Sequence, residues 1–271
     1  MESKLSEEPL PLMDHLRLAS RSAHRTSRTT ALAATAATAA SPTVYRGATV
    51  AFATVYAELE ATIEAVRLDH PRLGALHCPT LYRAAALAED VAFHHGGDSA
   101  AAAAALAAPP TPAVATYVAH IRSLAGGPSP ITLVGLASAM HIAPAAGGSV
   151  LSRLLRWTLR LGRGSGGLSV FDYPGVDVAA VRRRYKEGLN ALALSRAERD
   201  AVAAQRVRVF ALNDAVFVEV AAAAARGGVA TAGQGVVAVG RGVAVAAVLV
   251  GGAWAAREVL LGSVGVLLGW A

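Results

Sequence analysis

Three basic side chains near the N-terminus have the spacing of one helical face. Arg17, Arg21 and His24 stand at positions i, i+4 and i+7, which brings them to the same side of an α-helix. A neutral imidazole nitrogen can bind a metal ion, and guanidinium groups pair well with carboxylates. The spacing therefore suits a ligand that carries a metal and carboxylates, although an ordinary solvated basic face would show the same pattern.

A second basic pair lies far along the chain. Arg182 and Lys186 are four residues apart, within and just after a run of three arginines. The whole chain has a formal net charge of +6 and a pI near 10, which favours an acidic partner or an anionic membrane surface. The sequence contains no zinc-ligand spacing and no basic patch interleaved with aromatic residues, so nucleic acid is not expected as a partner.

Two small or polar elements interrupt apolar segments. The pair Gly147-Gly148 would let a helix backbone lie directly against a flat ligand, or it could simply break the helix. Asn213 shares a stripe with Val209, Val216 and Val220, so its side chain is predicted to be buried. A buried amide needs hydrogen-bond partners, which either ordered waters or protein groups could provide.

The remaining candidates have simpler interpretations. Cys78 is the only cysteine, so no intramolecular disulfide is possible and a reducing compartment is expected. Cys78-Pro79 reads as an ordinary cysteine before a turn. His94 and His95 are interpreted as polar loop or helix residues, and His141 has the same simple interpretation. Because His141 lies close to the glycine pair in the sequence, a second contact to the ligand is the alternative.

The elements that must position these residues are predicted to be helical throughout. Apolar residues recur at helical spacing, and no convincing pair of alternating strands is present. The fold class is therefore all-α, an irregular helical bundle, with residues 31–46 as a low-complexity stretch. The expected helices are Leu16–Thr30, Ala48–Leu68, Leu81–Phe93, Ala113–Leu124, Ile131–Leu161 (interrupted at Pro144 and Gly147-Gly148), Val178–Leu192 and Arg196–Arg226.

The chain divides into a short N-terminus, one domain and a hydrophobic tail. Residues 1–15 are acidic, without the apolar core of a secretory signal, and are expected to be flexible, followed by a helical domain at 16–225. Residues 226–271 contain few charges. Gly242–Ala256 is shorter than the roughly 20 residues that span a bilayer, but a start near Val236 lengthens it, with Arg241 close to one end. We expect a membrane anchor, the alternative being a glycine-rich peripheral segment.

Short segments in a fixed order are similar to the haem oxygenase family of the eukaryotic, membrane-anchored type. Their order is kept from about residue 16 to residue 222, which is more specific than any single motif. The segments are Ala19–His24, Tyr56–Glu60, Ala86–Phe93, Thr111-Pro112 with Tyr117-Val118, Gly147-Gly148, Gly167-Leu168 with Phe171 and Pro174, Tyr185 with Asn190, and Leu212-Asn213.

The resemblance implies that haem is both substrate and cofactor. It makes His24 the proximal ligand of the haem iron, and it places the backbone of Gly147 and Gly148 against the distal face. Tyr56, Tyr117 and Asn213 match family positions that anchor ordered distal waters. The candidate contacts to the two haem propionates are Arg17, Arg21, Arg182 and Lys186.

One part of the family's distal motif is absent. The family carries an aspartate three residues before the glycine pair, where this chain has Pro144, and a nearby arginine position reads Met140. Asp and Glu are absent throughout Ile131–Leu161, so a shift of the alignment does not restore the acid.

The resemblance implies oxidative cleavage of haem to biliverdin, carbon monoxide and ferrous iron, with O2 and electrons ultimately from NADPH. It also implies NADPH-cytochrome P450 reductase or a similar electron donor as partner, and attachment to the endoplasmic reticulum with the helical domain in the cytosol. The missing acid leaves a second hypothesis open, a non-catalytic haem-binding or haem-sensing protein. A third hypothesis is a helical membrane-attached scaffold without haem.

Overall fold

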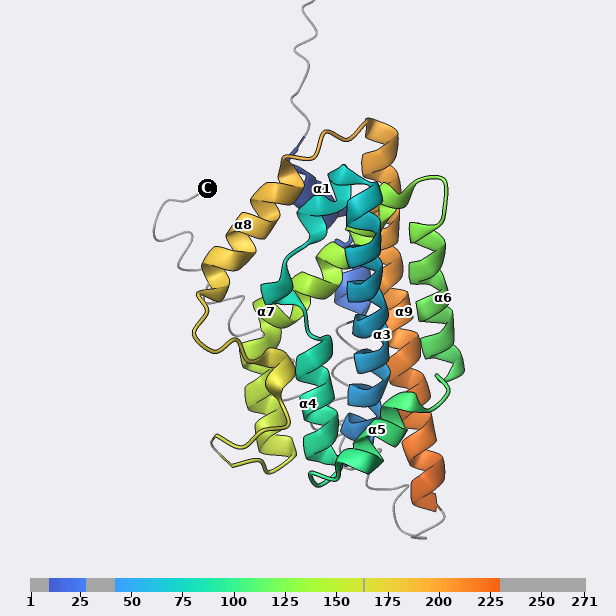
Figure 1. The fold of residues 1–271 in the computed structure, drawn as a ribbon, viewed down its shortest axis with the longest axis vertical. Helices are drawn as coiled ribbons and strands as arrows, with labels where there is room; N and C mark the ends of the chain where they lie inside the picture. Colours follow the sequence, from blue (N-terminus) through green and yellow to red (C-terminus); the bar gives the residue numbers. More distant parts are fainter. Residues whose placement is uncertain (1–9, 28–41, 163, 230–271) are drawn as a thin grey trace, which may run out of the picture.

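The computed structural model describes residues 10–27, 42–162 and 164–229, and every regular element in this part of the chain is helical (Figure 1). The all-α prediction is confirmed. The α-helices are α1 (Leu12–Ala19), α3 (Pro42–Asp69), α4 (Ala84–His94), α5 (Ser99–Ala107), α6 (Pro112–Ala125), α7 (Leu133–Thr158), α8 (Val178–Asn190) and α9 (Arg196–Val229). The short 3-10 helices are η1 (Pro71–Leu76), η2 (Pro79–Leu81), η3 (Pro130–Thr132) and η4 (Ser169–Phe171).

The first predicted helix is two helical pieces. Helix α1 begins at Leu12, before the predicted start, because Leu12 and Leu16 are both fully buried in the core. A turn at Ser20 then leads into a second helical stretch over residues 21–27. The backbone N–H of Ser20 donates to the carbonyl of Leu16 at 3.1 Å, and that of His24 donates to the carbonyl of Ser20 at 2.9 Å, so Ser20 ends one piece and begins the next.

Helices α3 and α5 show where the sequence interpretation fell short. Helix α3 starts at Pro42, inside the stretch taken as low-complexity, and Val44 and Tyr45 bury its first turn. Helix α5 was not predicted, because its alanine run has no contrast between apolar and polar positions. It is capped by the Asp98 carboxylate, which accepts from the backbone N–H groups of Ala100 and Ala101 at 2.9 and 3.0 Å, an arrangement that stabilises a helix start.

The predicted interruption of the fifth helix was wrong, because α7 runs unbroken through Pro144 and Gly147-Gly148. A proline inside a helix removes one backbone donor and strains the preceding turn. Nearly every residue of α7 up to Ile142 is buried, so packing holds the helix together. A phenolic hydroxyl from α3 also replaces the missing donor at this point.

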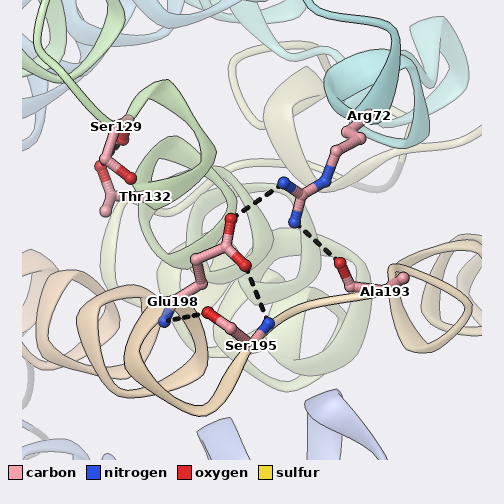
Figure 2. Close-up of polar contacts among 6 residues, drawn as sticks. All are labelled: Arg72, Ser129, Thr132, Ala193, Ser195 and Glu198. Carbon is pink, nitrogen blue, oxygen red and sulfur yellow. Dashed lines mark hydrogen bonds and ion pairs between the residues drawn. The ribbon is translucent and has the colours of Figure 1, made fainter.

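A capping box fixes the start of α9 (Figure 2). The backbone N–H of Ser195 donates to Glu198 Oε2 at 2.8 Å, and the N–H of Glu198 donates to Ser195 Oγ at 3.2 Å, which satisfies two otherwise orphaned donors. Arg72 of η1 donates to Glu198 Oε1 at 2.9 Å and to the carbonyl of Ala193 at 2.8 Å. The long helix is therefore anchored at its first turn to a distant part of the chain.

Helices α7 and α9 touch backbone to backbone near the start of α7. A Cβ atom built on Gly135 would lie 2.0 Å from the carbonyl oxygen of Val202 and 3.0 Å from the amide nitrogen of Arg206. Beyond this crossing the two helices diverge, and α7 leans toward α4 while α9 continues along α6 (Figure 1). Glycine at 135 is thus required by the crossing rather than by local backbone conformation.

Among the described residues, the stretch Pro130–Thr158 is long and apolar enough to cross a membrane, yet 78% of its most apolar window is buried in the fold. That burial is what a core helix shows. The tail predicted to be a membrane anchor lies outside the described residues from position 230 onward.

Candidate functional site

The N-terminal helical stretch carrying His24 lies along α9. Residues one turn apart in this stretch contact residues one turn apart in α9. Ser20 Oγ accepts from Arg206 Nε at 3.3 Å, the His24 ring packs edge-on against Phe210 with centroids 5.6 Å apart, and Ser27 Oγ donates to Asp214 Oδ1 at 2.6 Å. The stretch therefore runs parallel to α9, and the His24 side chain is exposed beside it.

The second half of α7 presents an apolar stripe to solvent. Ala143, Gly147, Val150 and Leu151 share one face by their spacing, and all are exposed, Val150 by 54% and Leu151 by 36%. A core helix that leaves such a face uncovered points to a binding surface. No atom lies within 4 Å of a Cβ built on Gly147, so open space adjoins the backbone here.

The two glycines of the pair serve different purposes. Gly148 is buried, and a Cβ there would lie 3.0 Å from Cδ1 of Phe171, so its role is close packing. Phe171 is held in place by Asp90 of α4, which accepts from the N–H groups of Ser169 and Val170 at 2.6 and 3.0 Å. Burial raises the pKa of Asp90, an effect that these backbone donors partly offset. Gly147 alone has the open surroundings expected of the ligand-facing residue.

Helix α9 supplies a third side to this region. Phe210, Asn213 and Phe217 are each partly buried on it, and Phe217 stacks against Phe52 of α3 with centroids 5.1 Å apart. Asn213 Oδ1 is buried and has no hydrogen-bond partner among the described residues. A buried amide oxygen normally has one, so this atom fits the predicted role of binding a water or ligand group. Together with the apolar stripe and the imidazole, it is compatible with a flat, largely apolar ligand such as haem.

The predicted propionate contacts lie on two elements. Arg17 and Arg21 are exposed, and Arg17 forms an ion pair with Asp14 at 3.5 Å, which contributes little at the surface. Arg182 of α8 donates to the carbonyl of Ala145 at 3.2 Å, while its buried Nε has no partner among the described residues. Lys186 is partly buried one turn further on and lines a shallow surface groove with Arg182. Arg182 thus reaches the distal segment of α7, and Lys186 lies beside it on α8.

Both distal tyrosines contact Met140. Tyr56 Oη donates to the Met140 carbonyl at 2.8 Å, and Tyr117 Oη donates to Met140 Sδ at 3.2 Å. Both are buried, and burial raises the pKa of each phenol, so both stay protonated. Since each phenol has a single proton, a distal water could only donate to these oxygens and not accept from them.

The Tyr56 contact is explained by Pro144. In an α-helix the carbonyl of Met140 would accept from the N–H of residue 144, and proline has none. The Tyr56 hydroxyl satisfies this buried carbonyl from outside the helix. The proline that departs from the family motif therefore also explains why Tyr56, a predicted site residue, donates its hydrogen bond to the Met140 carbonyl.

We expect a double-mutant cycle to reveal this coupling. Tyr56→Phe should lower the free energy of unfolding by about 1–3 kcal/mol, the cost of a buried carbonyl left unsatisfied. In a Pro144→Ala background the helix regains its own donor, so the same substitution should cost much less. Equal costs of Tyr56→Phe in the two backgrounds, measured by urea denaturation, would contradict the explanation.

His141 lies on the buried side of α7. Its Nδ1 shares a hydrogen bond with Tyr185 Oη at 3.1 Å, and its ring contacts those of Tyr82 and Tyr185. Burial, with a smaller effect from Arg83, lowers the pKa of His141 to about 3, so the imidazole is neutral. Its surroundings differ from the exposed stripe of Gly147, and they do not support a ligand contact.

The other singled-out side chains have local structural partners. A ring nitrogen of His94 bonds the carbonyl of Gly167 at 2.8 Å, and Nδ1 of His95 bonds that of Val91 at 2.8 Å. Cys78 is half-buried, and burial raises the pKa of its thiol, which disfavours a reactive thiolate.

Comparison with known proteins covers most of this domain. The family model described as "Heme oxygenase" matches residues 10–219. Heme oxygenase of Takifugu rubripes is 28% identical over 168 residues, which are 61% of this chain and 58% of that protein. Human heme oxygenase 1 is 29% identical over 168 residues, 61% of this chain and 56% of that protein. The chain thus matches less than two thirds of the length of either relative.

A solved structure shows the same fold. Heme oxygenase-1 from Synechocystis sp. PCC6803, solved in complex with heme, superposes with a TM-score of 0.69 at 21% identity, covering 78% of this chain and 92% of that one. The family model extends over the helices that carry His24, Gly147 and Asn213. By this match, the chain belongs to the heme oxygenase family.

Proposed function

We propose that this chain binds haem and catalyses its oxidative cleavage to biliverdin, carbon monoxide and ferrous iron, using O2 and electrons that originate from NADPH. The observation that carries the proposal is the uncovered apolar stripe of α7, with open space beside Gly147. The His24 ring packs against Phe210 of α9, and α9 is the helix that α7 crosses at Gly135. The Synechocystis protein of the same fold was solved with haem bound.

The residues have distinct proposed tasks toward this substrate. His24 ligates the iron, and the Gly147 backbone lies against the porphyrin. Bound haem supplies both the ring to be opened and the iron that activates O2. The candidate partners of its propionates are Arg17, Arg21, Arg182 and Lys186, since guanidinium and ammonium groups pair with carboxylates.

Proton delivery would rest on hydroxyls and waters, because Ile131–Leu161 contains no acidic side chain. The unpartnered Asn213 Oδ1 can accept a hydrogen bond from a distal water, and the Tyr56 and Tyr117 oxygens can accept further ones. These groups can order waters, but none of them is an acid near neutral pH.

The second candidate is a non-catalytic haem-binding or haem-sensing protein. The observation that favours it is the engagement of both tyrosine protons by Met140, which leaves fewer donors for a distal water network. In this case the pocket would hold haem while the oxygenase reaction would be lost.

The partner and location of the protein are further parts of the proposal. The basic groove on α8, lined by Arg182, Arg183 and Lys186, suits an acidic electron donor such as NADPH-cytochrome P450 reductase. The hydrophobic tail and the family analogy favour anchoring in the endoplasmic reticulum, with the helical domain in the cytosol.

A single-turnover assay of the haem-loaded protein with a reductant tests the proposal. Wild type should produce the absorbance of biliverdin, and Pro144→Asp should increase its yield several-fold, since a positioned general acid contributes about 100-fold or more when fully effective. Pro144→Ala is the matched control, because it restores the backbone N–H without adding an acid.

The outcomes separate the hypotheses. Persistent haem in wild type with biliverdin only in Pro144→Asp supports the non-catalytic candidate. Haem that is bound but converted by neither protein contradicts the proposed oxygenase activity, and it shows that restoring an acid at position 144 is not sufficient for the reaction. A flat haem titration contradicts both candidates and leaves the scaffold hypothesis.

A further inference from the structure

Arg206 of α9 is a cation for which the described residues supply no counter-ion. Its guanidinium donates from Nη1 to Ser138 Oγ at 2.9 Å and from Nε to Ser20 Oγ at 3.3 Å. No carboxylate of the described residues forms an ion pair with it. Arg206 is partly buried, and this desolvation lowers the pKa of its guanidinium. The group is fixed by two hydroxyls yet accessible to an anion that the described residues do not supply.

Neither serine needs the arginine. The hydroxyl of Ser20 donates to the carbonyl of Leu16 at 2.8 Å, and that of Ser138 donates to the carbonyl of Gly135 at 3.2 Å. Each proton is therefore already used within its own helix, and Arg206 takes only the remaining lone pairs. Both serines are buried, Ser20 by 97% and Ser138 completely, at 3% and 0% exposure. The two hydroxyls hold the guanidinium in place but do not neutralise it.

The position of Arg206 links it to the candidate site. Ser20 belongs to the N-terminal helical region and Ser138 to α7, so the guanidinium links these two elements. Arg206 precedes Phe210 by about one helical turn, and the His24 ring packs against Phe210. The cation therefore lies one turn of α9 from the proposed iron ligand and contacts the helix that carries the apolar stripe.

We propose that Arg206, held by Ser20 and Ser138, binds a carboxylate of the ligand, and specifically one haem propionate. The inference rests on the proposed function for the identity of that ligand. An arginine matches a carboxylate through two parallel N–H groups, and a carboxylate would supply the charge that the protein does not. Arg206 would then act in addition to the exposed arginines Arg17 and Arg21 that were predicted from the sequence.

Haem and haem dimethyl ester, which lacks both carboxylates, are the probes that test this role. Soret titrations would compare wild type, Arg206→Met and Arg206→Gln, with Arg208→Met as the matched control because Arg208 is an exposed arginine on the same helix. Loss of a charge-assisted hydrogen bond should weaken haem binding by about 10-fold or more. Binding of the ester should be unchanged, and Arg208→Met should behave like wild type toward both probes.

Thermal melting of the haem-free proteins provides a second, independent measurement. Removal of a partly buried charge that no described carboxylate compensates should leave the melting temperature of Arg206→Met unchanged or raise it. Arg206→Gln keeps hydrogen-bond donors for the two serines and tests binding if the methionine variant folds poorly. Equal weakening of haem and ester, or no weakening of haem, would overturn the inference even if wild type binds haem well. Failure of wild type to bind either probe would instead refute the proposed function.

Discussion

His24→Ala should remove the axial ligand and abolish the ligation spectrum of the bound haem. We expect haem affinity to fall by about 100-fold or more, the equivalent of about 2.7 kcal/mol. The His24 ring packs on Phe210 at the exposed side of its helix, so alanine removes the ligand without opening the core. Soret titration and the ferric and ferrous absorption spectra measure both effects.

His15→Ala is the matched control, since His15 is a histidine on the neighbouring helix α1 and pairs with Asp200 at 3.7 Å. It should leave the spectrum unchanged. Added imidazole should restore a histidine-like spectrum to His24→Ala by filling the vacated position. A wild-type spectrum in His24→Ala would refute the ligand assignment, and with it the proposed orientation of the site.

Gly135→Ala should destabilise the fold more than any other single-methyl change considered. The added Cβ would lie 2.0 Å from the carbonyl oxygen of Val202, and backbone atoms cannot rotate away as a side chain does. We expect a loss of at least about 3 kcal/mol in the free energy of unfolding, the upper end of ordinary overpacking costs. Urea denaturation monitored by circular dichroism measures it.

Gly188→Ala provides the comparison, because no atom lies within 4 Å of a Cβ at this exposed position in α8. Alanine there should stabilise the protein by up to about 1 kcal/mol through its higher helix propensity. A similar effect of the two substitutions would show that the α7–α9 crossing tolerates separation, contrary to the geometry. Loss of haem binding in Gly135→Ala would follow from a displaced α7.

The helices with strong periodicity could be predicted from the sequence, and those without it could not. Val55, Leu59 and Ile63 recur at helical spacing and are completely buried in α3. Helix α5 has no such contrast, and its signal was instead the Asp98 cap. The course of α7 past Pro144 is supported by the hydrogen bond from Tyr56 to the Met140 carbonyl. Tyr56 lies 88 residues before Pro144 in the sequence, so no local pattern could reveal this support.

The candidate site was predictable only in its outline. The resemblance points to His24, whose ring packs on Phe210. It also points to Gly147, which has open surroundings, and to Asn213, whose Oδ1 has no hydrogen-bond partner among the described residues. Arg206 was not singled out, because nothing in the run from Gln205 to Arg208 distinguishes it from a solvated arginine. Its significance comes from the absence of a nearby carboxylate in the described part of the chain, which only the folded arrangement can show.

The hydrogen bond from Tyr56 to the Met140 carbonyl also constrains the evolutionary history of the chain. A proline at 144 is tolerable only while a hydroxyl donor already stands at 56, so the tyrosine should have preceded the proline. Once the proline is present, drift of Tyr56 to phenylalanine becomes deleterious. Reversion at 144 would lift this epistatic restriction in one step, because the helix would regain its own donor to the Met140 carbonyl and the phenol proton would be released for another acceptor.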